Sequence, residues 1–250
     1  MSKLLSVKSG VPMADCSACV HRTSLLAASR CQPGDACVVA ESGRQIDRFF
    51  RRNPELAQDY LTDRFWERRA IAVRYAPVDM AHELVGDVDE VVRRAVATRL
   101  PLEFLRQLAR DPDREVRITV MSRLPPERLG DFVGDPDYMV RLQVAHRLPH
   151  GLLPRLAQDP DREVRKEVAR RLPPFALGRM MRDPDEEVRR IVAARLLPED
   201  AVQMLGDADW LVRFGAAGQA PVAVLAGLID DPEPDVRSLV RRRLAEINPR

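Results

Sequence analysis

Aromatic residues and long apolar runs are both scarce in this 250-residue sequence, in which Phe, Trp and Tyr supply only 5% of the residues. No stretch approaches the roughly 18 consecutive apolar residues of a membrane-spanning helix. The apolar run near the start is also too short for the hydrophobic segment of a secretory signal. We therefore expect a cytoplasmic protein without a membrane partner.

Recognisable enzyme motifs are absent as well. The sequence holds no G-x-G-x-x-G, no P-loop and no G-x-S-x-G. Its four histidines form neither a metal-ligand pattern nor a catalytic triad. The 40 basic residues nearly balance the 38 acidic ones, and the net charge of +2 gives no whole-molecule argument for nucleic-acid binding. These absences predict a protein that is not an enzyme.

A 24-residue repeat is the dominant feature of the sequence. We number each copy from a recurring Asp, taken as position zero, which is followed by a second acidic residue at position two in most copies. Arg stands at position six of all eight copies, and Leu usually stands at position thirteen. The recurring Asp residues are Asp63, Asp87, Asp111, Asp135, Asp159, Asp183, Asp207 and Asp231.

One copy, residues 159–182, shows what the repeat encodes. Its Asp-Pro-Asp start is typical of a turn that leads into a helix, because an Asp carboxylate accepts hydrogen bonds from the first helical N–H groups. Three apolar residues then fall at four-residue steps, which predicts the buried stripe of a helix of about ten residues: Val164, Val168 and Leu172. Pro173 ends that helix. Leu177 and Met180, three residues apart, favour a short 3₁₀-helix.

The length of the repeat selects the architecture. Two full helices with their turns need roughly 34 residues, as in tetratricopeptide repeats, and the L-x-x-L-x-L strand of leucine-rich repeats is missing. Each copy should therefore hold one α-helix and one 3₁₀-helix, and stacked copies should share a continuous core. The sequence predicts an all-α solenoid.

The repeats suggest three segments. Residues 63–250 hold the eight copies, and residues 41–62 look like a degenerate earlier copy that lacks the acidic start. Phe65 and Trp66 replace the acidic turn of the first clear copy, which suits a junction with a different module. We assign that module, with all the cysteines, to residues 1–40.

The four cysteines form one cluster in the sequence, with the spacing Cys16-x2-Cys19-x11-Cys31-x5-Cys37. Cysteines stay reduced in the cytoplasm, so four close together predict metal ligands better than disulfides. The Pro-Gly pair between the last two predicts a turn that folds the ends of their segment together. Four thiolates make a complete set for a tetrahedral zinc ion or a 4Fe-4S cluster. Unligated structural thiols are a third interpretation.

Copies such as DPDREVRKEVARRLPPFALGRMMR resemble the leucine-rich repeat variant family, and the segment from Cys16 to Cys37 resembles the 4Fe-4S domain that precedes such repeats in some members. The resemblance covers nearly the whole chain. It implies a right-handed superhelix of alternating α- and 3₁₀-helices. It also implies that Cys16, Cys19, Cys31 and Cys37 bind one 4Fe-4S cluster.

Four thiolates would close every corner of such a cluster, and the C-x3-C-x2-C motif of radical enzymes is missing. Three roles remain for the cluster module: electron transfer, redox sensing, and capping of the apolar end of the solenoid. The leading hypothesis is an iron–sulfur protein whose solenoid binds another, unidentified protein. The alternatives are an electron carrier that docks on a redox enzyme, a nucleic-acid binder, and a structural zinc protein.

Two rows of arginine bear on these alternatives. The position-six row, from Arg69 to Arg237, recurs together with Asp and is interpreted as an internal ladder of ion pairs. The position-twelve row has no recurring acidic partner, which makes it the better candidate for a basic binding surface. Its members are Arg99, Arg123, Arg147, Arg171, Arg195 and Arg243.

Overall fold

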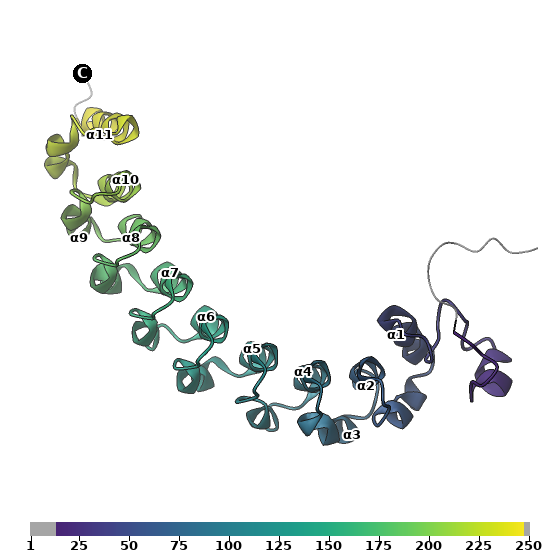
Figure 1. Ribbon diagram of the computed structural model, residues 1–250. Helices are drawn as coiled ribbons and strands as arrows, with labels where there is room; N and C mark the ends of the chain where they lie inside the picture. Colours follow the sequence, from purple (N-terminus) through teal and green to yellow (C-terminus); the bar gives the residue numbers. More distant parts are fainter. Residues whose placement is uncertain (1–13, 248–250) are drawn as a thin grey trace, which may run out of the picture. The chain divides into compact units, whose positions relative to one another are not determined.

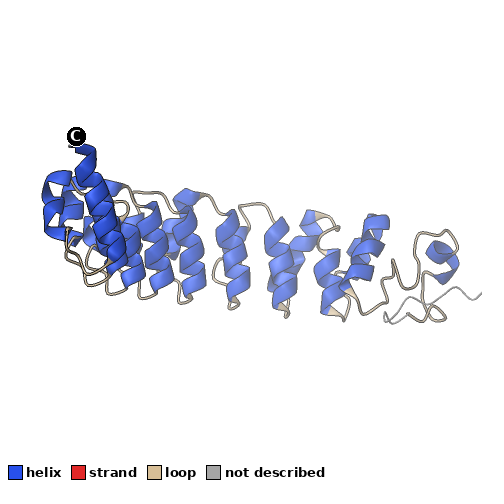
Figure 2. Ribbon diagram, turned by 90° about the horizontal axis from the view of Figure 1, so that it is seen from above, coloured by secondary structure: helices blue, strands red, loops and turns tan. Residues whose placement is uncertain are grey.

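The structure, a computed structural model, describes residues 14–247. Within that range it contains helices and no β-strand (Figure 2), and the only paired extended residues are Gln32 and Ala36, which form an isolated bridge. The described residues divide after Leu124 into two compact units. No described helix combines the length and the apolarity that a bilayer span requires.

Short 3₁₀-helices alternate with α-helices along most of the described chain (Figure 1). The α-helices are α1 (Gly43–Arg52), α2 (Trp66–Ala72), α3 (Val78–His82), α4 (Glu90–Arg99), α5 (Arg114–Arg123), α6 (Tyr138–Arg147), α7 (Arg162–Arg171), α8 (Glu186–Ala193), α9 (Pro198–Ala201), α10 (Trp210–Gln219) and α11 (Pro234–Ile247). The 3₁₀-helices are η2 (Pro54–Tyr60), η3 (Glu83–Gly86), η4 (Leu105–Gln107), η5 (Pro126–Phe132), η6 (Leu153–Leu156), η7 (Pro174–Met180), η8 (Val202–Met204) and η9 (Val222–Leu228), and η1 (Arg22–Leu26) is a π-helical turn.

The repeat that contains α7 forms as its sequence predicts. Asp159 Oδ1 accepts a hydrogen bond from the Asp161 N–H at 2.9 Å and so closes the turn. Asp161 is the N-cap, and its Oδ1 accepts from the Glu163 N–H at 2.8 Å. The ten residues of α7 end before Leu172, and η7 follows after Pro173. The predicted fold class, alternating α- and 3₁₀-helices without strands, is confirmed.

The core of the second unit lies between a row of α-helices and a row of 3₁₀-helices. In that unit the longer α-helices pack side by side in one row, which contains α6, α7, α8 and α10. The 3₁₀-helices form a second row along one side of it (Figure 1). Val164 and Val168 are fully buried, as is Leu177 from η7. Burying one such side chain contributes about 1.5–3 kcal/mol, and the gain recurs in every copy.

The position-six arginines form the predicted ladder. In six of them the guanidinium fork binds both carboxylate oxygens of the position-zero Asp in the next copy, while Nη1 donates to backbone carbonyls at the start of its own copy. Within the two units these pairs are Arg69–Asp87, Arg93–Asp111, Arg141–Asp159, Arg165–Asp183, Arg189–Asp207 and Arg213–Asp231.

The position-twelve arginines also have partners inside the repeats, which the sequence analysis did not foresee. Five of the six donate from Nη1 to a backbone carbonyl 26 residues earlier, at the end of the main α-helix of the copy before: Arg99, Arg123, Arg171, Arg195 and Arg243. Gln219 stands at this position in its copy and donates to the Ala194 carbonyl at 3.0 Å. The row is therefore part of the bonding between repeats, which weakens its case as a basic binding surface.

Residues 41–62 form a helix pair of their own. They contain α1 and η2, so this degenerate copy repeats the arrangement of the clear ones despite its missing acidic start. Two later copies depart slightly from the predicted pattern, because a short α-helical turn, α3 or α9, precedes their 3₁₀-helix. The division into 1–40, 41–62 and 63–250 stays a prediction, and its first thirteen residues lie outside the described range.

Candidate metal-cluster site

The segment between Cys31 and Cys37 folds back on itself through a tight turn. The Asp35 N–H donates to the Gln32 carbonyl at 3.1 Å, with Pro33 and Gly34 at the two central positions. Gly34 has a φ of 79°, the left-handed conformation that a type II turn requires there. Gln32 and Ala36 exchange both backbone hydrogen bonds. The two cysteines thus stand at the neck of one loop, as the Pro-Gly pair predicts.

The segment with the other two cysteines is tied to this loop through Leu25. The Cys19 N–H donates to the Cys16 carbonyl at 3.3 Å, which closes a turn between the two thiols. The chain then passes through η1, where the buried Leu25 accepts hydrogen bonds at its carbonyl from the N–H groups of Arg30 and Cys31. Backbone hydrogen bonds consequently tie the two cysteine segments to each other.

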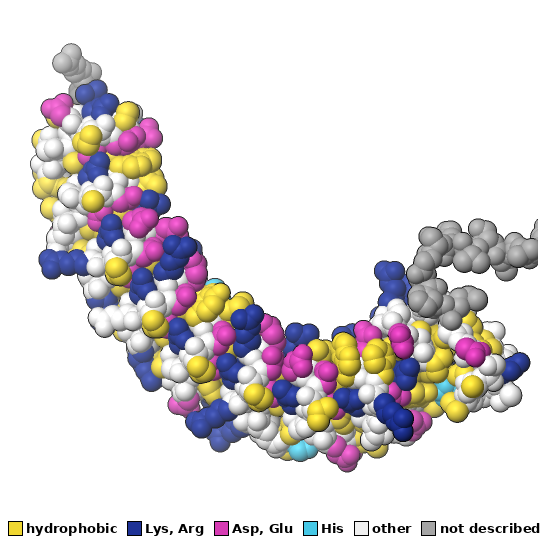
Figure 3. All heavy atoms as spheres, in the orientation of Figure 1, with side chains coloured by type: hydrophobic (Ala, Val, Ile, Leu, Met, Phe, Trp, Pro, Cys, Tyr) yellow, Lys and Arg dark blue, Asp and Glu magenta, His cyan; other side chains and the backbone are white. Residues whose placement is uncertain are grey.

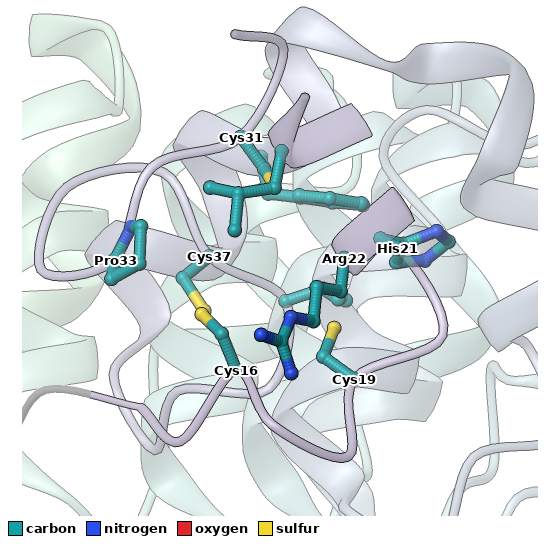
Figure 4. A pocket seen from close by; sticks show the side chains of 10 residues that line it. Cys16, Cys19, His21, Arg22, Cys31, Pro33 and Cys37 are labelled. Carbon is teal, nitrogen blue, oxygen red and sulfur yellow. The ribbon is translucent and has the colours of Figure 1, made fainter. Parts of the chain in front are cut away.

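All four cysteines line one small pocket. In Figure 4 the sulfur atoms of Cys16 and Cys37 point toward one another, and Cys19 and Cys31 approach from other sides. None of the four is in a disulfide, and Cys37 is buried while the others are partly exposed. The rest of the lining is mostly apolar, with one imidazole and one guanidinium: His21, Arg22, Leu26, Pro33, Val38 and Phe49.

The thiols lie close enough to influence one another's ionisation. Burial raises the pKa of the Cys16 thiol first, and the nearby Cys37 and Cys19 raise it further. The pKa of Cys31 is raised by burial and then by the other three cysteines. Arg22 opposes the shift at Cys16, as Arg52 does at Cys31. Four thiolates in so small a space would repel one another, so this donor set fits a cationic inorganic centre.

The cysteine loop is anchored on α1. Asp35 accepts from the guanidinium of Arg48 and, at 2.8 Å, from that of Arg52. Asn53, at the end of α1, donates from Nδ2 to the Arg30 carbonyl at 3.1 Å. The Cys37 N–H donates to the Gln45 carbonyl at 3.1 Å. The module and the first helix pair are therefore packed as one body.

A second anchor joins His21 to η2. Its Nε2 lies 2.6 Å from the Tyr60 hydroxyl, and its ring centre lies 5.4 Å from that of Phe49. Burial, followed by the nearby Cys19, raises the pKa of Tyr60 to about 12, so this phenol stays protonated at neutral pH. Burial also lowers the pKa of His21, which favours the neutral imidazole. The contact is thus a neutral hydrogen bond beside the cysteines.

Sequence reasoning located the four cysteines but not the residues that hold them. Of the basic residues near the cysteines, Arg30 pairs with Glu55, whereas His21 and Arg22 line the pocket. Asp35 could have been noticed because it is the only charged residue between the last two cysteines. The anchors of α1 and η2 carry no comparable signal.

Comparisons with known proteins agree with this picture. The family model described as "LRV protein FeS4 cluster" matches residues 10–59, and the model described as "Leucine rich repeat variant" matches residues 91–113, 138–161 and 162–185. A solved structure described as a leucine-rich repeat variant with a novel repetitive protein structural motif is 56% identical, with a TM-score of 0.88 over 93% of this chain and 99% of that chain.

A curated relative matches over a shorter range. An uncharacterized 27.7 kDa protein in the nifB 3′ region of Rhodobacter capsulatus is 42% identical over 87 residues, which are 35% of this chain and 35% of that protein. The match thus spans about a third of the relative's length.

Proposed function

Because the chain belongs to the leucine-rich repeat variant family, we propose that it is a non-enzymatic iron–sulfur protein whose helical repeats bind another protein. In this proposal Cys16, Cys19, Cys31 and Cys37 bind one 4Fe-4S cluster. The observation that carries it is that these four residues, and no other cysteine, line a single pocket. A cluster held by four thiolates keeps no iron open to a substrate, which supports a role other than catalysis.

A cluster suits the geometry better than a zinc ion. Tetrahedral zinc needs all four sulfur atoms about 2.3 Å from one point, and within residues 14–247 no three His, Cys, Asp or Glu side chains converge closely enough to hold one metal ion. In a 4Fe-4S cluster each thiolate binds a different iron, so the sulfur atoms stand around the centre instead of meeting at it. The ring of cysteines around the pocket is compatible with that second arrangement.

We propose that the cluster stabilises the end of the repeat stack and responds to oxidants. The cysteine module packs against α1, where Ile46, Phe49 and Phe50 are fully buried. An unfinished end of a stack would leave such residues in water. Three of the cysteines are partly exposed, so small oxidants have access to the site. Loss of the cluster would then loosen the module that covers α1.

Electron transfer is the second candidate, and the openness of the pocket favours it. A bound cluster supplies reversible one-electron chemistry, and the partly exposed cysteines would place it near the surface. The exposed Val20, beside Cys19, is 80% accessible and offers an apolar contact for a redox partner. A reversible midpoint potential, together with rapid reduction by a partner enzyme, would support this role over capping.

A protein partner for the repeats fits the surface better than a nucleic acid. Both arginine rows bind within the repeats, and acidic and basic side chains are interspersed over the face drawn in Figure 3. Tyr138 on α6 and Phe214 on α10 are 41% and 37% exposed, so each offers aromatic surface to a partner. A binding assay on duplex and single-stranded oligonucleotides at rising salt tests this preference, because phosphate contacts give a steep salt dependence.

The cluster is tested by anaerobic reconstitution of the purified chain with iron and sulfide. We expect iron and sulfide in equal amounts, about four of each per chain, and a visible absorption band that bleaches on reduction. Cys16→Ser should lower iron binding, whereas Ser17→Ala, a change at its exposed neighbour, should not. A colourless protein with one tightly bound zinc ion would contradict the proposal.

A further inference from the structure

Gln45 on α1 carries a buried carboxamide without a hydrogen-bond partner. The residue is only 3% exposed, and neither Nε2 nor Oε1 bonds to any group of the described residues. Buried polar side chains in native proteins almost always have partners, because the desolvation of a donor is costly when nothing replaces water. A group that binds the native protein and is not part of the polypeptide would resolve this cost.

The position of Gln45 indicates where that group lies. Gln45, Phe49 and Asn53 are four residues apart and therefore share one face of α1. Phe49 lines the cysteine pocket, and Asn53 donates to the carbonyl of Arg30, the residue before Cys31. The Gln45 carbonyl accepts from the Cys37 N–H at 3.1 Å. Phe49 and Asn53 thus meet the cysteine module through their side chains, and Gln45 meets it through its backbone carbonyl, next to Cys37.

We infer that Gln45 donates a hydrogen bond from Nε2 to sulfur at the Cys37 corner of the bound cluster. The acceptor is an inorganic sulfide beside Cys37, because Nε2 reaches no acceptor among the described residues, Cys37 Sγ included. This inference rests on the proposed function, because only a bound cluster supplies the sulfur acceptor. Cys37 is the most buried of the four cysteines, so water has little access to a sulfide at that corner and a protein donor is needed there.

The hydrogen bond has a predictable electronic effect. A donor aimed at cluster sulfur stabilises the extra electron of the reduced state and so raises the reduction potential. Gln45 would therefore adjust the potential while leaving the four Fe–S(Cys) bonds unchanged. Its removal should shift the midpoint potential to more negative values and speed the loss of the cluster to a chelator.

The test compares Gln45→Met with Gln58→Met in the full chain. Methionine keeps the length of the side chain but removes the donor, and Gln58 is an exposed residue of η2 in the same body. In the reconstituted proteins we expect a more negative midpoint potential and faster cluster loss for Gln45→Met alone. In the metal-free proteins Gln45→Met should melt at the same or a higher temperature than the unchanged chain, because it removes an unpartnered amide.

A measurement without substitution covers the case in which Gln45→Met does not fold. Electron–nuclear spectroscopy on the reduced protein, with the glutamine side-chain amides labelled by ¹⁵N, should detect one amide coupled to the cluster. The inference is overturned when the cluster loads normally but its potential is unchanged in Gln45→Met, or when no labelled amide couples to it. Failure of the unchanged chain to bind iron and sulfide would instead contradict the cluster proposal itself.

Discussion

Arg141 in α6 forms a bidentate ion pair with Asp159, eighteen residues later, at the start of the next copy. Nε lies 2.7 Å from Oδ2 and Nη2 lies 2.9 Å from Oδ1, while Nη1 donates to the Asp135 carbonyl at 2.8 Å. One guanidinium therefore joins the starts of two successive copies. Asp159 also closes the turn before α7, so a single pair fixes both the spacing of the copies and the start of a helix.

Removal of this arginine should destabilise the second unit strongly. The side chains of Arg141 and Asp159 are 10% and 2% exposed, so Arg141→Met leaves a buried carboxylate without its counter-charge. We expect a loss of about 3 kcal/mol in the free energy of unfolding, measured by urea denaturation. Arg162→Met, at a 57% exposed side chain of α7, is the matched control and should cost no more than about 0.5 kcal/mol. Equal losses for the two variants would refute a structural ladder.

The position-twelve row leads to a second prediction, in which the hydrogen-bond donor matters more than the positive charge. Arg195 donates to the Ala169 carbonyl, and Gln219 does the same to Ala194 one copy later. Arg195→Gln should therefore cost little, because an amide is a natural substitute there. Arg195→Leu leaves a helix-end carbonyl unpaired and should lower the free energy of unfolding by about 1–2 kcal/mol. Arg195→Leu should therefore melt at a lower temperature than Arg195→Gln. Identical melting temperatures would argue against this hydrogen bond.

The ladder also predicts instability in acid. The hydrogen bond from Arg213 lowers the pKa of Asp231 below its ordinary value of 3.8. Outside the ladder, the hydrogen bond from Arg190 lowers the pKa of Asp209 in the same way. A carboxyl with a lowered folded pKa contributes stability above its unfolded pKa and loses it as the pH falls through the folded value. Urea midpoints should thus be flat near neutral pH and fall steeply below about pH 4. The double variant Arg213→Gln, Asp231→Asn should have a lower urea midpoint at neutral pH, and that midpoint should fall less in acid. A pH curve parallel to that of the unchanged chain would exclude this pair as a source of the acid instability.

How much the sequence predicts depends on how often a feature is repeated. Eight copies act as a substitution record, so the Asp cap, the buried Val and Leu stripe and the position-six ladder could all be predicted. The position-twelve bonds were missed because their acceptors are backbone carbonyls, which leave no trace in side-chain patterns. The four cysteines were predicted to gather, and the structure brings them to one pocket. The residues around the cysteines, such as Tyr60 and Gln45, occur in one place only, so no repeated pattern could predict their role.

The last prediction concerns Asp35, which connects the cysteine loop to α1. It lies in the loop between Cys31 and Cys37 and accepts hydrogen bonds from both Arg48 and Arg52 of α1. These pairs are partly exposed, with side chains 30–44% accessible, so each contributes at most about 1 kcal/mol.

Asp35→Asn should therefore leave the fold intact but let the loop separate from α1 more often. The reconstituted variant should lose its cluster to a chelator several-fold faster, while Asp230→Asn, at an exposed residue of the second unit, should match the unchanged chain. High salt should speed the loss in the unchanged chain but hardly in Asp35→Asn, because screening acts on the pairs that the variant lacks. Identical rates in all three proteins would mean that the thiolate bonds alone hold the loop in place.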